Sequence, residues 1–410
     1  MKFQTRAVSS NISQSTHGET TPAIYQSVAY AYEDGEQLVD VFEGRKFGHV
    51  YSRISNPSVT ALEQRLTLLE QGRGSVALAS GMAALHALIL ALVKPGESIV
   101  ASTSLFGGTY LLFRDVIETL NIEIRYVAPL DVAAIEDAID ESTRLVFVES
   151  IGNPKLDVPN LREISTVTKA KGVPFAVDTT LVSPYILNAK SFGVDLVVSS
   201  ATKYMGPSGT TVGGYITDLG NFDWKSSKSE GVSIASKKAG EFAFMLHLRQ
   251  KVVTNIGSLL SPFNAYLFMV GLETLALRMD QHSNSALKLS EFLEGHASVR
   301  DVNYPGLKKN PSYEVAKLQF DGKCSGLMTL CLGSKEKAFK FLKALKLVKN
   351  MTNIGDARTL AIHPASTLYK DLNASDLEAA GVSEDMVRIS VGLEHHDDII
   401  ADFDQALAQV

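Results

Sequence analysis

The chain has 410 residues, of which 45% are hydrophobic and 20% charged, and its formal net charge is -6. This composition is typical of a compact protein with two domains and argues against the disordered and membrane classes. The acidic balance lacks the basic excess of nucleic-acid-binding proteins, so we expect neither nucleic acid nor membrane as a partner. Two cysteines are too few for a disulfide framework, and the N-terminal residues contain no apolar run, so the sequence predicts a cytoplasmic protein.

The first part of the chain, residues 1–56, is polar and has little periodicity. We therefore expect an extended arm, and an arm of that length usually packs on another part of the protein or on a neighbouring subunit. A helix is then predicted to begin at Pro57, because leucines recur at helical spacing from Leu62 to Leu69. Gly72 is the residue expected to end it.

Short apolar runs then alternate with segments of helical pattern. These runs are rich in β-branched residues and are bounded by turn residues, at 75–80, 98–102, 145–150, 175–178 and 195–200. Buried parallel strands have this character, and the segments between them have the length of crossover helices. We therefore expect an α/β cofactor domain over residues 57–258 built on a mostly parallel, seven-stranded type of sheet.

From residue 259 the pattern changes. A long helical stretch is expected around 262–279, followed by strands at 326–332 and 387–393 with helices between them. This pattern predicts a second, smaller α/β domain with a mixed sheet over residues 259–410. The Ser/Lys-rich segment 224–238 is the one candidate for a loop excursion.

Residues that could bind a ligand or take part in chemistry lie at the ends of the predicted strands. In an open parallel sheet, ligands bind beyond the carboxyl ends of the strands. The residues found there are Gly81, Phe106, Glu149 to Asn153, Asp178 and Lys203.

Lys203 follows an apolar strand, where a partly desolvated amine would have a lowered pKa and could form a Schiff base. A solvated loop lysine is the alternative and would be favoured without its neighbours. Asp178 could keep a pyridine nitrogen protonated, but a turn or helix-capping aspartate is an equal alternative.

An anion site is predicted beside this lysine. Gly81 and Met82 open a helical stretch, so their N–H groups would point at an anion, although a plain strand-to-helix turn would look the same. The hydroxyls of Ser200 and Thr202 could add donors to a phosphate.

Several strings together resemble the Cys/Met-metabolism enzymes that depend on pyridoxal phosphate. The strings are YSRISNP (51–57), SGMAA (80–84), FGGTY (106–110), ESIGNP (149–154), VDTT (177–180), SATKY (200–204) and VRISVGLE (387–394). The resemblance runs in order through most of the chain. It implies the aspartate-aminotransferase-like fold (fold type I) and pyridoxal 5'-phosphate as cofactor, with no metal.

The resemblance also implies roles for single residues. Catalytic roles fall on Lys203, Asp178 and Tyr51. The implied cofactor contacts are Lys203, Asp178, Gly81, Met82, Phe106, Asn153, Thr180, Ser200 and Thr202, with Tyr51 and Arg53 reaching the phosphate from a neighbouring subunit of a homo-oligomer, a homotetramer or a dimer. Arg388 is implied as the clamp for the substrate's α-carboxylate, and without the resemblance it would be a surface or interface arginine.

Departures from the family narrow the expected reaction. Many relatives have a tyrosine at Phe106, and a ring without a hydroxyl favours release of a carboxylate over release of a thiolate. The segment Asn353 to Asp356 resembles the O-acetylhomoserine sulfhydrylases, which would place Asn353 near the substrate's carboxylate. Ser208 stands where a family histidine is common, and its role stays open.

The expected activity is therefore γ-replacement of acetate by sulfide on O-acetyl-L-homoserine, which gives homocysteine for methionine biosynthesis. Alternatives are an O-succinylhomoserine sulfhydrylase, a cystathionine γ-synthase, a methionine γ-lyase, or a catalytically silent protein that binds pyridoxal phosphate. The sulfur donor is open between free sulfide, a thiol and a thiocarboxylated sulfur-carrier protein. A nicotinamide-linked dehydrogenase is disfavoured because no G-x-G-x-x-G follows the first strand.

Overall fold

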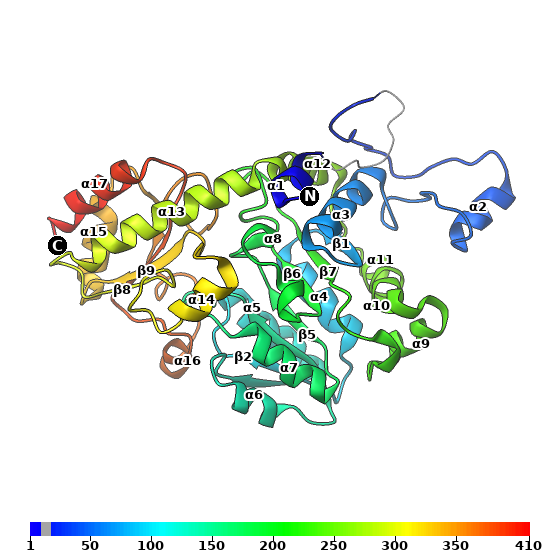
Figure 1. Cartoon of the computed structure of the whole chain (residues 1–410), viewed down its shortest axis with the longest axis horizontal. Coiled ribbons are helices and arrows are strands. Elements are labelled where there is room, and N and C mark those ends of the chain that lie inside the picture. Colours follow the sequence, from blue (N-terminus) through cyan, green and yellow to red (C-terminus); the bar gives the residue numbers. More distant parts are fainter. Residues whose placement is uncertain (10–17) are drawn as a thin grey trace.

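The structure, a computed structural model, describes residues 1–9 and 18–410. Its centre is a seven-stranded sheet in the order β1-β7-β6-β5-β4-β2-β3 (Figure 1). The strands are β1 (Gly74–Leu78), β2 (Ser98–Ser102), β3 (Glu123–Val127), β4 (Thr143–Glu149), β5 (Phe175–Asp178), β6 (Leu196–Ser199) and β7 (Gly214–Asp218). The five predicted strands of this sheet are confirmed, and β3 and β7 are additions to them.

The sheet is mostly parallel, as predicted. Strand β7 runs antiparallel to both of its neighbours, β1 and β6, whereas the pairs among β2 to β6 are parallel. Successive side chains of β4 enter different cores, because Val146 and Val148 join one apolar cluster while Leu145 and Phe147 join another. Both faces are therefore covered, which explains why the strands are near-continuous apolar runs.

A smaller sheet lies in the C-terminal part, in the order β10-β11-β12-β9-β8. Its strands are β8 (Asp301–Asn303), β9 (Leu327–Cys331), β10 (Lys349–Asn350), β11 (Leu360–Ile362) and β12 (Met386–Ser390). Strand β12 lies at its centre, antiparallel to both β11 and β9. One apolar cluster includes both Val146 of the large sheet and Phe403 near the C-terminus, so the division at 258/259 stays a proposal.

Helices surround the two sheets. They are α1 (Phe3–Ser9), α2 (Gly35–Phe42), α3 (Pro57–Glu70), α4 (Gly81–Leu92), α5 (Gly107–Leu112), α6 (Val132–Ala138), α7 (Leu161–Lys171), α8 (Ser183–Ile186), α9 (Glu230–Ala239), α10 (Ala243–His247), α11 (Thr254–Ile256), α12 (Pro262–Glu273), α13 (Leu275–Glu294), α14 (Tyr313–Phe320), α15 (Lys335–Ala344), α16 (Ala374–Ala379) and α17 (His396–Leu407). Across the described ranges, we find no helix with both the length and the apolar character needed to cross a bilayer.

Helix α3 shows how the local sequence sets an element. Asn56 caps it by accepting a hydrogen bond from the Ser58 N–H, and Pro57 occupies the first position. Leu62, Leu66 and Leu69 face the core, and burying each contributes roughly 1.5–3 kcal/mol. The helix ends at Glu70, and its C-cap Gln71, not Gly72, takes the left-handed conformation with φ 56°.

The N-terminal region is only partly extended. The prediction of an extended arm over residues 1–56 is wrong for the segments that form α1 and α2. The carboxylate of Asp34 caps α2 and so favours a helix there. Figure 1 shows the chain of α2 reaching away from the body. The expected loop excursion at 224–238 is wrong, because this segment contains most of α9. The predicted helical stretch around 262–279 is confirmed, with a break at Thr274 between α12 and α13.

Candidate active site

A cavity of about 270 Å³ lies at the carboxyl edge of the large sheet. The predicted residues that line it are Gly81, Met82, Phe106, Asn153, Asp178, Thr180, Ser200, Thr202, Lys203, Asn353 and Arg388. The first nine lie at or after the ends of strands β1, β2, β4, β5 and β6, and the last two come from the C-terminal part. The fold therefore brings these predicted residues together, as the position of the strand ends requires.

Lys203 is partly buried in the turn that follows β6. Its Nζ donates a hydrogen bond of 2.9 Å to Oδ1 of Asn353. Burial and the charge of Arg388 lower the pKa of Lys203 to about 8. The alternative of a solvated loop lysine is therefore wrong, and the amine has the character of a nucleophile or base near neutral pH.

Asp178 is the last residue of β5 and also lines the cavity. Its Oδ1 accepts a hydrogen bond of 2.7 Å from the Thr180 N–H, so the carboxylate forms the turn considered as its alternative role. Burial nevertheless raises the pKa of Asp178 to about 6, against the hydrogen bonds from Thr180 that lower it. A cationic partner in the cavity would offset this desolvation.

The N-terminus of α4 opens onto the same cavity. Ser80 caps the helix by accepting a hydrogen bond from the Ala83 N–H at 3.0 Å. A Cβ on Gly81 would lie 2.6 Å from Cβ of Ser200, so a side chain at this position would collide with the neighbouring segment. Glycine thus leaves the start of α4 open to an anion. Thr202 already pairs both ways with the backbone of Gly213, at 3.0 Å each.

Arg388 is buried in the central strand of the small sheet and is only 3% exposed, so the alternative of a surface arginine is wrong. Its Nη1 donates a hydrogen bond of 3.2 Å to Oδ1 of Asn153. Among the described residues no carboxylate pairs with this guanidinium, whose titratable neighbours include Tyr369 and Tyr204, and burial lowers its pKa. The cation is therefore suited to an anionic ligand.

Two features of the cavity were not predicted from the sequence: the contact of Asn353 with Lys203 and the shifted pKa of Glu149. Asn353 reaches Lys203, and its Nδ2 lies 3.5 Å from Oδ2 of Asp356, a buried carboxylate. Glu149, at the end of β4, also lines the cavity, and burial together with the charge of Asp178 raises its pKa well above the usual range. The position of Glu149 at this edge is the predicted one, at the end of its strand.

Tyr51 and Arg53 do not line this cavity within their own chain. Arg53 donates a hydrogen bond of 2.6 Å from Nη1 to the carbonyl oxygen of Thr254, and its Cζ lies 5.6 Å from the centre of the Tyr51 ring. Tyr51 is 42% exposed. Their assignment to a neighbouring subunit's phosphate therefore stays a proposal. Ser208 lies outside the cavity as well.

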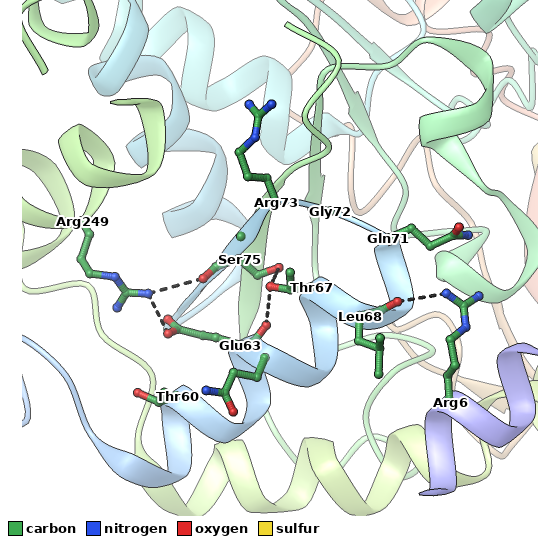
Figure 2. A pocket seen from close by; sticks show the side chains of 12 residues that line it. Arg6, Thr60, Glu63, Thr67, Leu68, Gln71, Gly72, Arg73, Ser75 and Arg249 are labelled. Carbon is green, nitrogen blue, oxygen red and sulfur yellow. Dashed lines mark hydrogen bonds and ion pairs between the residues drawn. The ribbon is translucent and has the colours of Figure 1, made fainter. Parts of the chain in front are cut away.

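A larger but shallow hollow of about 630 Å³ lies between α1, α3 and the helical turn Leu248–Val253 and carries three arginines (Figure 2). Arg249 pairs with Glu63 at 2.7 Å, and Arg73 pairs with Asp218 and Glu241. Arg6 donates to the carbonyl oxygen of Leu68. The positive charges of Arg249 and Arg73 are thus balanced by carboxylates, and the hollow lacks the nucleophile and strand-end geometry of the first cavity.

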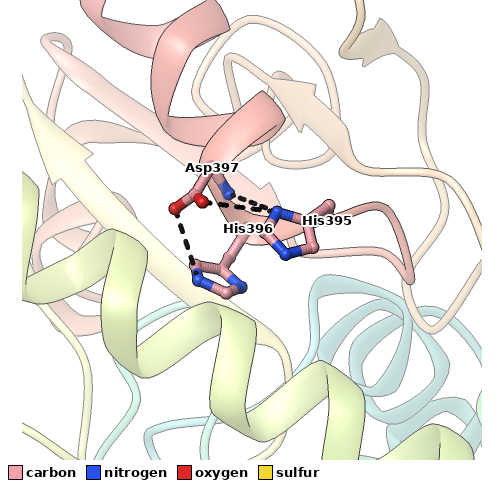
Figure 3. Close-up of side chains that lie close together, drawn as sticks. All are labelled: His395, His396 and Asp397. Carbon is pink, nitrogen blue, oxygen red and sulfur yellow. Dashed lines mark hydrogen bonds and ion pairs between the residues drawn. The ribbon is translucent and has the colours of Figure 1, made fainter.

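In the described part of the chain, one group offers three potential metal ligands, His395, His396 and Asp397 at the start of α17 (Figure 3). Nδ1 of His395 accepts a hydrogen bond from the Asp397 N–H, and Nε2 of His396 lies 2.9 Å from Nζ of Lys288. Nitrogen atoms that a metal would need are therefore taken by hydrogen-bond partners, and the N-terminus of a helix disfavours a cation. We assign no metal to this group.

Comparison with known proteins gives one consistent family. The family model of the Cys/Met metabolism PLP-dependent enzymes matches residues 4–408. The O-acetyl-L-homoserine sulfhydrylase of Leptospira meyeri is 38% identical over 406 residues, which cover 94% of this chain and 92% of that protein.

Solved structures agree with this match. The O-acetylhomoserine sulfhydrylase of Wolinella succinogenes is 42% identical, with a TM-score of 0.79, over 87% of this chain and 99% of that one. A crystal structure from Campylobacter jejuni, assigned as an O-acetylhomoserine (thiol)-lyase, has a TM-score of 0.92 and 30% identity and covers all of both chains. It contains N'-pyridoxyl-lysine-5'-monophosphate.

Proposed function

The chain belongs to the Cys/Met metabolism PLP-dependent enzyme family, and we propose that it catalyses γ-replacement on O-acetyl-L-homoserine. Sulfide takes the place of acetate on the γ-carbon, and homocysteine is formed. One observation carries the proposal: Lys203, Asp178 and Arg388 line a single cavity at the carboxyl edge of a fold type I sheet. The named activity of the Leptospira and Wolinella relatives supports the choice of substrate.

The residues of the cavity fit pyridoxal 5'-phosphate. The open start of α4 at Gly81 and Met82 suits its phosphate, and the buried carboxyl group of Asp178 suits a protonated ring nitrogen. Lys203 offers a partly neutral amine, and Phe106 offers an aromatic ring. When bound, this cofactor supplies an electron sink beside the amino group of the substrate.

The chain's own residues would orient the substrate and move protons. We propose that Arg388 binds the α-carboxylate of the substrate, because it is a buried cation whose hydrogen-bond partner is a neutral amide. Nζ of Lys203 takes the proton from the α-carbon and then serves the β-carbon, a role that needs a pKa near the working pH. Asn353 Oδ1 accepts the hydrogen bond that orients this amine.

The titration of Lys203 gives a testable pH dependence. Only the neutral amine is a nucleophile, and with a pKa of about 8 its fraction at pH 7 is roughly 300-fold larger than for an ordinary lysine. In cofactor-free protein, the rate of pyridoxal-phosphate uptake should rise as pH rises to about 8 and then level off. Absorbance of the bound cofactor measures this rate between pH 6 and 10. Reaction with Nα-acetyl-lysine in the same buffers corrects for titration of the cofactor itself, and a continued rise above pH 9 would contradict the lowered pKa.

The cavity also predicts which ester is used. Its only cationic residues from the described chain are Lys203 and Arg388, and both have proposed roles. A succinyl ester brings a second carboxylate that would be buried without a partner, whereas an acetyl ester does not. We expect kcat/KM for O-acetylhomoserine to exceed that for O-succinylhomoserine by about tenfold or more, which corresponds to about 1.4 kcal/mol.

Steady-state kinetics with both esters and sulfide checks this preference, and elimination of methionine should be weak. Phe106→Tyr restores a hydroxyl and should raise any elimination that releases a thiolate. Efficient cleavage of methionine or cystathionine by the unaltered protein would instead move it among the lyases.

Three further proposals concern partners and place. Tyr51 and Arg53 of one subunit complete the site of another in a homo-oligomer, for which we propose a tetramer. Sulfide is the proposed sulfur donor, with a thiol or a thiocarboxylated carrier protein as alternatives. The substrates are small molecules of biosynthesis, so we propose that the protein acts in the cytoplasm.

A further inference from the structure

One buried hydroxyl joins two loops of the cavity. Tyr369 follows β11 in the C-terminal part and is only 1% exposed. Its hydroxyl donates a hydrogen bond of 2.7 Å to the carbonyl oxygen of Asn153 and accepts one of 3.3 Å from the Gly107 N–H. A phenolic oxygen both donates and accepts, so this one atom links the turn after β2 to the loop after β4.

Glu149 links the same two loops from the end of β4. Its Oε1 accepts a hydrogen bond of 2.6 Å from the Phe106 N–H, and its Oε2 accepts one of 3.2 Å from the Asn153 N–H. Two side chains from distant parts of the sequence thus make four hydrogen bonds to backbone groups of the same two loops. The relative position of these loops is fixed twice.

The joined loops carry groups proposed to face the ligands. Phe106 lines the cavity, and Oδ1 of Asn153 accepts the hydrogen bond from Arg388. Tyr369 itself does not line the cavity, although the preceding residue, Leu368, does. Its influence on a bound molecule must therefore pass through the loops that it holds.

The packing around Tyr369 leaves little freedom. A Cβ built on Gly107 would lie 3.1 Å from Cε1 of Tyr369 and 3.2 Å from the carbonyl oxygen of Leu368, so the ring rests directly on the turn. Burial raises the pKa of Tyr369, which keeps its hydroxyl protonated and able to donate. Loss of the hydroxyl would leave the Asn153 carbonyl and the Gly107 N–H without this partner.

We propose that Tyr369 is a positioning residue for carboxylate recognition: together with Glu149 it fixes the Asn153 loop, and through Asn153 it holds Arg388 in the geometry that binds an amino-acid carboxylate. The proposal rests on the proposed function, in which Arg388 is the carboxylate clamp. A displacement on the order of 1 Å in such a clamp can change rates by about 100-fold. The hydroxyl of Tyr369 is therefore expected to act on binding of the carboxylate and not on cofactor content.

The test compares two ligands that differ by one carboxylate. L-norvaline is an amino acid without an ester, and n-butylamine is the same molecule without its carboxylate. Both are titrated into the cofactor-loaded protein, and the absorbance change of the cofactor gives each dissociation constant. In Tyr369→Phe, affinity for L-norvaline should fall by about tenfold or more, while affinity for n-butylamine changes by less than about threefold. KM for the amino-acid substrate should rise with little change in kcat.

Tyr110→Phe is the matched control. Its hydroxyl donates a hydrogen bond of 3.1 Å to Oδ2 of Asp376 on α16, and it does not contact the Asn153 loop. This variant removes the same atom from a neighbouring tyrosine and should leave both affinities unchanged. If Tyr369→Phe does not retain cofactor, Glu149→Gln tests the same linkage, because an amide keeps only one of the two acceptors.

Three outcomes separate the claims. Selective loss of L-norvaline binding supports the proposal. Unchanged binding, or equal loss for both ligands, overturns it while leaving the carboxylate role of Arg388 intact. If the unaltered protein binds L-norvaline no better than n-butylamine, Arg388 is not the clamp, and both the proposed carboxylate site and this inference fall.

Discussion

Replacing Lys203 by alanine is expected to abolish turnover, by about 10⁴-fold or more, because the variant loses both the covalent hold on the cofactor and the base that moves protons. The amine is partly buried, is oriented by the hydrogen bond that it donates to Asn353, and has a pKa of about 8. Its removal cannot be compensated by solvent at the same position. Kinetics with O-acetylhomoserine and sulfide measure the loss.

Chemical trapping identifies the same atom independently. The purified protein should be yellow, and borohydride followed by peptide mapping should place the pyridoxyl group on Lys203. Lys190→Ala is a suitable control, since Nζ of Lys190 donates to the Gln71 carbonyl oxygen and Lys190 lies outside the cavity. An adduct on any other lysine, or none, would overturn the assignment.

The second large effect is recovery of activity when two variants with different defects are mixed at a cofactor concentration too low to load the Arg53→Ala protein. Arg53→Ala should weaken cofactor binding by on the order of 2–3 kcal/mol if Arg53 makes a charge-assisted hydrogen bond to the phosphate. Within its own chain Arg53 contacts Thr254 and does not line the cavity, which supports placing it in a neighbour's site. Lys203→Ala is inactive for a different reason.

Mixing these variants under conditions of subunit exchange gives mixed dimers for half of the population, if pairing is random and isologous. In each mixed dimer one site combines an intact Lys203 with an intact Arg53, and the other site has both changes. Activity should therefore return to about a quarter of the unaltered level. Mass spectrometry verifies subunit exchange. If the subunits exchange and no activity returns, Arg53 serves its own subunit.

The sequence predicted the strands whose composition reflects burial on both faces. Strands β2 and β5 have the predicted bounds, since each is a short apolar run between turn residues. Strand β3 was missed because it lies at the sheet edge and contains Glu123 and Arg125, which face polar surroundings. Strand β7 was missed because it is inserted between β1 and β6, a pairing that local sequence does not express.

The residues of the candidate site also divide into positions that the sequence predicts and contacts that it does not. Positions at strand ends were predictable, because the topology of a parallel sheet brings them to one edge. The pairing of Lys203 with Asn353 joins residues 150 apart, and that of Tyr369 with Asn153 joins residues 216 apart. Such contacts depend on how the two sheets pack and on side-chain conformations. The composition of α9, rich in Ser and Lys, likewise conceals a helix in which one valine, Val232, is buried.

Helix α1 ties the beginning of the chain to a much later part. Phe3 and Ala7 are buried, and α1 contacts α12 and α13, which begin at Pro262 and Leu275. Helix α3 also contacts α1 and is synthesised soon after it, whereas α12 and α13 are synthesised only after all strands of the large sheet. The part of the apolar face of α1 that packs on α12 and α13 can therefore be covered only late in translation.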